Sequence, residues 1–319
     1  MPNALLRLAL AGAAAAALTA CGATAPAPLP DRTPRAGPEA APWTRPVDLV
    51  AADLDALRDP ASPGFYAAAI AAHGRIRELA WRWRGWEHAA RVDARGDAVE
   101  HDLRPGPSRE RGGSRTVRWE RDPDGRVLAR VETTFRGDAV DARVYADDGA
   151  GGRLVTRSRT GPGRGPSLRY DYAYDDAGRL ATVTTCLVDD GAAAVQDVAH
   201  YRYDAAGRPV AVDGAGAATL RWDDRGRLLA LETELGRRWE LRWSAAGTLA
   251  ELVYEDRFSA PRPARASVRF DPRGLPEQLT EAGGPGASCA FRRDDGVVVG
   301  ALCASGEELS VGYEVLPPE

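Results

Sequence analysis

The sequence predicts an all-β fold, in which consecutive antiparallel β-hairpins form one curved, partly rolled sheet after a short N-terminal helical segment. Two observations lead to this prediction. From Arg77 onward the apolar residues alternate with a period of two, which is typical of strands with one buried face. In addition, an aromatic residue, an aspartate, two variable residues and a glycine recur as a unit every twenty to thirty residues, which indicates repeated hairpins.

Each repeat unit is expected to end one strand and start a tight turn. Aspartate suits the first turn position because its carboxylate can accept a backbone N–H two residues on, and glycine supplies a positive φ. The pattern therefore predicts a type I turn followed by a glycine bulge. The residues assigned to these turns are Asp93, Gly96, Asp122, Gly125, Asp175, Gly178, Asp204, Gly207, Asp223, Gly226, Gly247, Asp271 and Gly274.

Looser matches near Gly152 and Gly296 bring the candidate turns to nine. Nine hairpins would supply about eighteen strands, and open twisted sheets rarely exceed about ten strands without curling. This is why we expect the sheet to roll.

The unit aromatic-Asp-x-x-Gly-Arg-Leu resembles the YD repeat of Rhs and teneurin-like proteins. The resemblance runs from about Val92 to Val299 and is most specific at Gly178, Gly207 and Gly226. In that family, consecutive hairpins form one continuous antiparallel sheet, which winds into a shell in the long members. The resemblance thus implies a short, stand-alone member built from the same hairpins.

The start of the chain resembles the signal of a bacterial lipoprotein. Residues 1–20 contain Arg7, an apolar run from Leu8 to Ala17 and small residues directly before Cys21. The apolar run is too short to cross a bilayer as a helix, which takes about 20 residues. In lipoproteins the cysteine of this motif is lipidated and becomes the mature N-terminus, so we expect Cys21 to attach the chain to a membrane. The alternative is an ordinary secretory signal followed by an incidental cysteine.

Three further segments follow the signal. Residues 21–46 are rich in alanine and proline, which is typical of an extended tether. Residues 47–76 are expected to hold two short helices, with apolar residues at helical spacing in the first and the second over Phe65–Ala72. Residues 77–319 form the hairpin array. Gly22 lacks the aspartate that commonly retains lipoproteins at the inner membrane, which favours an outer-membrane location in the cell envelope.

Composition and motifs exclude several classes of function. The net charge of −4 and the pI of about 5.7 argue against nucleic-acid binding, which usually needs a basic face. The four histidines fit no metal-binding spacing, and we find no nucleophile elbow, phosphate-binding loop or dinucleotide fingerprint. The sequence therefore predicts no metal site, no cofactor and no enzymatic activity.

Outside the cytoplasm disulfides can persist. Cys289 and Cys303 flank a candidate turn and could face each other across one hairpin, and the alternative is two small buried apolar residues. Cys186 would be left over.

These observations lead to two hypotheses for function. The first is a non-enzymatic cell-envelope lipoprotein whose repeat sheet is a binding or scaffold surface for envelope proteins or glycans. The second is a periplasmic carrier of lipid or another hydrophobic ligand, in which Trp81, Trp83 and Trp86 line a groove on the concave face of the sheet. Aromatic residues beside the turns could also stack on sugars, although cross-strand packing already explains them.

Overall fold

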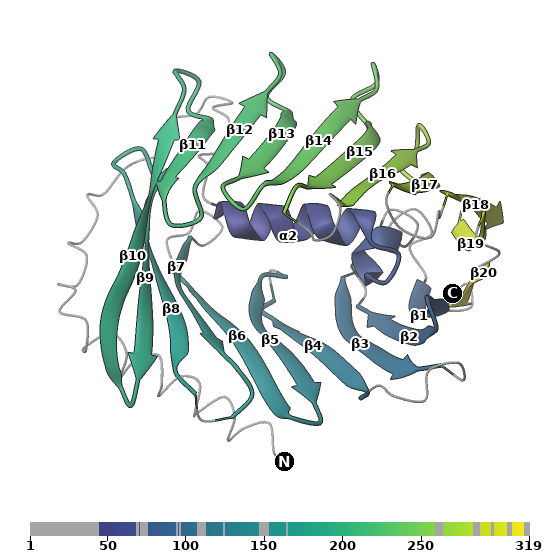
Figure 1. Ribbon diagram of the computed structural model, residues 1–319, viewed down its shortest axis with the longest axis horizontal. Helices are drawn as coiled ribbons and strands as arrows, with labels where there is room; N and C mark the ends of the chain where they lie inside the picture. The colour runs from purple at the N-terminus through teal and green to yellow at the C-terminus, as the bar shows by residue number, and fades with distance from the viewer. Residues whose placement is uncertain are drawn as a thin grey trace.

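The protein is a closed barrel of antiparallel strands with one helix inside it (Figure 1). The computed structural model describes residues 45–315 apart from 68–69, 71–75, 94, 96, 107–112, 124, 147–152, 164, 259–263, 283–287, 295–296 and 305–307. The sheet has 20 strands, each paired antiparallel to the next strand along the chain, and the last pairs with the first.

The elements follow in a simple order. Helix α2 (Val47–Arg58) and the short 3-10 helix η1 (Pro63–Tyr66) come first. The strands are β1 (Ile76–Trp83), β2 (Trp86–Val92), β3 (Ala98–Pro105), β4 (Arg115–Arg121), β5 (Val127–Thr134), β6 (Gly137–Tyr145), β7 (Leu154–Thr160), β8 (Ser167–Tyr174), β9 (Leu180–Asp189), β10 (Ala192–Tyr203), β11 (Pro209–Gly214), β12 (Ala218–Trp222), β13 (Leu228–Thr233), β14 (Arg237–Trp243), β15 (Leu249–Asp256), β16 (Ala264–Phe270), β17 (Pro276–Ala282), β18 (Ser288–Asp294), β19 (Val297–Cys303) and β20 (Glu308–Val315).

The predicted all-β class and consecutive hairpins are confirmed, but the prediction of a partly rolled sheet is wrong. The strands that flank the nine predicted turns are β2 to β19, although Gly152 and Gly296 themselves lie outside the described residues, and two more strands, β1 and β20, flank that array. These two pair with each other, with Trp81 opposite Val311. An unpaired edge strand exposes a row of N–H and C=O groups, and closure removes both edges at once.

The hairpin order gives the barrel two different ends. Turns after even-numbered strands, which include all the predicted Asp-x-x-Gly turns, lie at one end, and we call this end the Asp-turn rim. Turns after odd-numbered strands lie at the other end, the opposite rim. In Figure 1 the hairpin tips β10–β11, β12–β13 and β14–β15 point upward, and the tip of β9–β10 points downward.

Helix α2 crosses the inside of the barrel and packs one face against the wall. Val47, Val50 and Leu54 recur at helical spacing and are buried in the main apolar core. That core continues onto the inner faces of β10 to β20 and β1, with Trp239, Leu252 and Val268 among its least exposed members. The inner face of β5 to β7 is different, because charged residues reach it there.

Candidate functional site

A single aspartate organises each well-formed repeat turn. At Asp204, one carboxylate oxygen accepts the N–H groups of Ala206 and Arg208, both at 2.9 Å, and the other accepts Arg208 Nε at 2.7 Å. Gly207 donates its N–H to the Asp204 carbonyl at 3.0 Å and has a φ of 75°. The pairing register shifts beside this turn, between Arg202 and Tyr203, as a glycine bulge requires.

Most of the other predicted turns have the same design. Aspartate oxygens accept N–H groups from residues within the turn at Asp93, Asp122, Asp175, Asp223 and Asp271. Ser244 takes the place of the aspartate in the turn that contains Gly247, where Thr248 donates its N–H to the serine hydroxyl at 3.2 Å. Positive φ values occur at Gly125, Gly178, Gly226, Gly247 and Gly274, whereas Gly96 lies outside the described residues.

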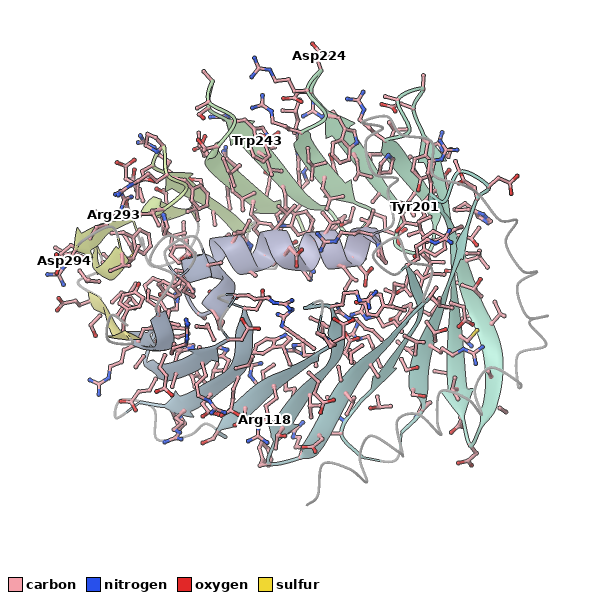
Figure 2. All side chains as sticks on the ribbon, turned by 180° about the vertical axis from the view of Figure 1, so that it is seen from behind. Arg118, Tyr201, Asp224, Trp243, Arg293 and Asp294 are labelled. Atoms are coloured by element: carbon pink, nitrogen blue, oxygen red, sulfur yellow. A yellow bond between two sulfur atoms is a disulfide. The ribbon has the colours of Figure 1, made fainter. Side chains whose placement is uncertain are left out.

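The aromatic residue before each turn ties one repeat to the previous strand. The Tyr203 hydroxyl donates to the Leu180 carbonyl at 2.5 Å, and the Trp222 indole donates to the Pro209 carbonyl at 2.7 Å. The Arg179 guanidinium lies over the Tyr203 ring at 4.6 Å. These contacts engage the polar atoms of the aromatic residues within the repeats, so we assign these residues to the fold. Figure 2 shows Asp224 projecting from the Asp-turn rim, away from α2.

The two tryptophans Trp81 and Trp83 do not form an accessible surface, which corrects their assignment to a ligand groove. Each is only 3% exposed and belongs to the main apolar core. The Trp81 indole donates to the Pro60 carbonyl at 2.8 Å, and its ring lies 5.2 Å from that of Tyr66. The segment around η1 therefore covers this part of the sheet. Trp86, opposite Trp83 on β2, is partly buried.

Two histidines, His88 on β2 and His101 on β3, are paired inside the barrel. His88 Nδ1 lies 3.1 Å from His101 Nε2, and both rings stack on Trp81, at 4.9 Å and 5.3 Å between centroids. Burial lowers the pKa of His88 to about 4, and the nearby charge of Arg115 adds to this effect. Burial, with further contributions from His88 and two arginines, lowers the pKa of His101 to about 3. Both rings are therefore neutral at pH 7.

A buried ion-pair network fixes α2 to the far wall. The Arg157 guanidinium, on β7, donates to Asp141 of β6 at 2.6 Å and also to Asp48 in the first turn of α2. Burial alone would lower the pKa of Arg157, but the bond to Asp141 and the charges of Asp48 and Asp141 outweigh it and raise the pKa. Tyr201 of β10 accepts the Val47 N–H at 2.9 Å, and it lies beside the start of α2 in Figure 2.

A groove with a volume of about 500 Å³ runs over the outer face of β20, β1, β2 and β3. The groove forms because Gly312, Ala80 and Ala89, which have small side chains or none, lie in register on three adjacent strands. Polar side chains border it, at Glu78, Arg91, Glu100 and Asp102.

One wall of this groove is a row of alternating charge. Glu100 accepts Arg91 at 2.9 Å and Arg118 at 2.8 Å. Although its partial burial would raise the pKa of Glu100, these two arginines outweigh that effect and lower the pKa. Two residues along β3, Asp102 accepts a hydrogen bond at 2.6 Å from the hydroxyl of Thr116, which lies opposite it on β4. The groove therefore offers carboxylates and guanidinium groups beside a floor of small residues.

Sequence reasoning missed both the groove and the buried charges. The groove floor combines residues from both ends of the chain, and only the pairing of β20 with β1 brings them together. The buried charges had one signal, namely that the oppositely charged Asp141 and Arg157 lie on the successive strands β6 and β7.

Cys289 and Cys303 face each other on β18 and β19 and form a disulfide with an S–S distance of 2.06 Å. Cys186, on β9, is buried and takes no part in this disulfide. Cys21 lies outside the described residues.

The described residues contain no group of three or more histidine, cysteine, aspartate or glutamate side chains placed to hold a metal ion. No helix among them is both long and apolar enough to span a membrane.

Comparison with known proteins gives likeness in fold only. No family model matches the chain, and no curated protein sequence matches it. A Tc toxin complex, TcdB2-TccC3-Cdc42, is 8% identical, with a TM-score of 0.28 over 68% of this chain and 20% of that chain. The Tc holotoxin pore of Photorhabdus luminescens is 11% identical, with a TM-score of 0.24 over 68% of this chain and 15% of that chain.

A porin-like protein from Bacteroides uniformis is 12% identical, with a TM-score of 0.32 over 76% of this chain and 98% of that chain. The present chain spans a fifth or less of the Tc toxin chains.

Proposed function

We propose that the protein is a non-enzymatic lipoprotein of the cell envelope, built from YD-type (Rhs-type) repeats, whose barrel binds an envelope protein or glycan on its outer face. The observation that carries this proposal is the position of the groove. It lies on the outside of β20, β1, β2 and β3, whereas α2 and the apolar core occupy the inside of the wall on that side. A ligand can reach the groove without any movement of the barrel.

The chemistry of the groove favours a polar, extended ligand. Carboxylates at Glu78 and Asp102 can accept hydrogen bonds from hydroxyl or amide groups, and Arg91 can donate them. The floor of Ala80, Ala89 and Gly312 leaves room for a chain to lie across the strands. Hydroxyl-rich glycans and extended peptides both match this pattern of donors and acceptors.

The envelope location depends on the N-terminal sequence. The lipobox-like segment before Cys21 and the proline-rich tether after it support a lipid anchor. Replacing Cys21 with serine should abolish incorporation of radiolabelled palmitate in cells. Unchanged labelling of this variant would refute the anchor.

The carrier hypothesis receives less support from the structure. A lipid would need the concave face of the sheet, but α2 packs there and Trp81 and Trp83 are covered. Protein purified from cells should therefore show no lipid beyond the covalent anchor in native mass spectrometry. A non-covalently bound lipid in stoichiometric amount would favour the carrier over the binding module.

The binding proposal can be tested by photo-crosslinking in cells. A photoreactive amino acid at Ala89, on the groove floor, should capture a specific envelope protein or glycan. The matched control is Thr219, an exposed outer-face residue on β12, because no residue of that strand lines the groove. The same products from both positions, or none from Ala89, would refute the groove as the binding site.

A further inference from the structure

Exposed apolar side chains gather at one end of the barrel. Phe135, Leu235 and Phe258 are 79%, 62% and 73% exposed, which is far beyond what core packing explains. Phe135 lies in the turn after β5, Leu235 in the turn after β13, and Phe258 directly after β15. Because all three strands are odd-numbered, the three residues share the opposite rim. Among the described residues near the Asp-turn rim, the exposed large apolar side chains are Leu128 and Val144, at only 38% and 41%.

The three side chains are spread around the rim in two places. Phe258 and Leu235 border one shallow depression, where the Phe258 ring lies over Gly236. Phe135 follows β5, which is eight strands from β13 in a ring of 20, and Figure 1 shows β5 and β13 on facing walls of the barrel. A ligand that filled one groove would touch only one of these places, whereas a flat surface laid across the end of the barrel would touch both.

The charges beside these residues indicate which flat surface fits. Arg136 lies over the Phe135 ring at 5.3 Å, while Glu234 and Asp256 border the depression together with Arg237. Carboxylates are as frequent here as arginines, so the rim presents apolar side chains within a nearly balanced charge pattern. The interface of a lipid bilayer fits such a rim, because buried apolar area alone contributes to binding there and no complementary charge pattern is needed for that contribution.

We propose that the opposite rim docks on a lipid bilayer by inserting Phe135, Leu235 and Phe258 into its interface. The proposal takes the envelope location from the proposed function, and it gives the anchored barrel an orientation. Cys21 precedes Arg45 by 24 positions, and a chain of that length spans at most about 85 Å. The tether is therefore long enough for this rim to reach the membrane. The Asp-turn rim would then point away from the bilayer, with the outer groove accessible from the side.

Cosedimentation with vesicles tests the rim independently of the lipid anchor. The protein is the full mature chain with Cys21→Ser, and the vesicles are phosphatidylcholine alone or phosphatidylcholine mixed with phosphatidylglycerol. We expect binding to both compositions and little loss in high salt, because apolar insertion drives it. The triple variant Phe135→Ser, Leu235→Ser and Phe258→Ser should lose at least tenfold in partitioning. The control variant Leu128→Ser and Val144→Ser should bind like its parent.

Each other outcome overturns the proposal. Equal binding by the triple variant would refute the role of the rim, and binding to phosphatidylglycerol alone would indicate headgroup attraction instead of insertion. Absence of vesicle binding together with a dimer that the triple variant loses in ultracentrifugation would identify a second copy of the chain as the occupant. Because the three side chains are exposed, the triple variant should keep its melting temperature, which is checked in parallel. Palmitate labelling tests only the anchor at Cys21, and vesicle binding tests only the rim, so failure of the proposed anchor and failure of the rim proposal are distinguishable.

Discussion

Arg157 on β7 and Asp141 on β6 form a buried ion pair, with Arg157 Nη2 2.6 Å from Asp141 Oδ2. The two side chains are 7% and 11% exposed. Through Nη1, Arg157 also donates to Asp48 of α2, so this pair connects the helix to β6 and β7. The relationship explains how one short helix can cross the barrel in a fixed position.

Replacing Arg157 with methionine should strongly destabilise the protein. The change leaves the Asp141 carboxylate buried without its partner, and breaking a buried pair in this way costs about 3–5 kcal/mol. Urea unfolding of the variant measures this loss. Arg202→Met is the matched control, because Arg202 pairs with Asp213 at 64% and 55% exposure. The control should change the free energy of unfolding by about 1 kcal/mol or less. Equal effects of the two changes would show that the buried pair does not secure the helix.

The stacked histidines should make the protein less stable in acid. The pKa values of His88 and His101 in the folded state, about 4 and about 3, lie below the ordinary value of 6.5, so the unfolded chain binds these protons more readily. Their contribution to stability is therefore complete above pH 6.5 and is lost as the pH falls toward 4. The loss is up to about 3 kcal/mol for each histidine.

The measurement is the free energy of unfolding between pH 8 and about pH 4. The double variant His88→Gln and His101→Gln should show a smaller slope of this free energy against pH than the parent. His200→Gln is the control, because His200 is exposed on β10, and its slope should match that of the parent. A parental slope in the double variant would contradict the assignment.

The features of this structure that the sequence predicts are those whose contacting residues lie close together in the chain. The Asp204 turn could be predicted because the five consecutive residues 204–208 contain all its determinants, namely a carboxylate, N–H groups close by and a glycine at positive φ. The same holds for the nine-hairpin array. Barrel closure could not be predicted, because it depends on the match between β1 and β20, which no local pattern specifies.

The candidate sites follow the same rule. His88 and His101 are 13 residues apart on adjacent strands, but their neutral, buried state depends on Trp81 and on the segment that covers it. Trp81 and Trp83 look like a ligand surface in the sequence because large aromatics on one face of a strand suit either a groove or a core. Only the position of η1 and α2 decides between these two, and that is a tertiary contact.

Replacing Gly207 with alanine should destabilise the repeat turn through backbone strain alone. Gly207 has a φ of 75°, and a Cβ there would meet no atom closer than 3.9 Å. An alanine in the left-handed region costs about 1–2 kcal/mol, which should lower the melting temperature measurably. Gly161→Ala is the control, because Gly161 has no such φ and open space around its Cβ position. The turn assignment fails if the two variants melt at the same temperature.

Closure of the barrel should appear as slow hydrogen exchange in β1 and β20. In a closed sheet both strands have a partner on each side, since β1 pairs with β2 and β20, and β20 pairs with β19 and β1. In an open sheet each of these strands would leave alternate N–H groups free to exchange. We expect protection in both strands comparable to that in β10, which lies at the centre of the array. Val311→Pro in β20 removes a donor opposite Trp81 and should raise exchange selectively in β1 and β20. Fast exchange in these two strands of the unmodified protein would mean that the sheet is open, as the sequence alone suggested.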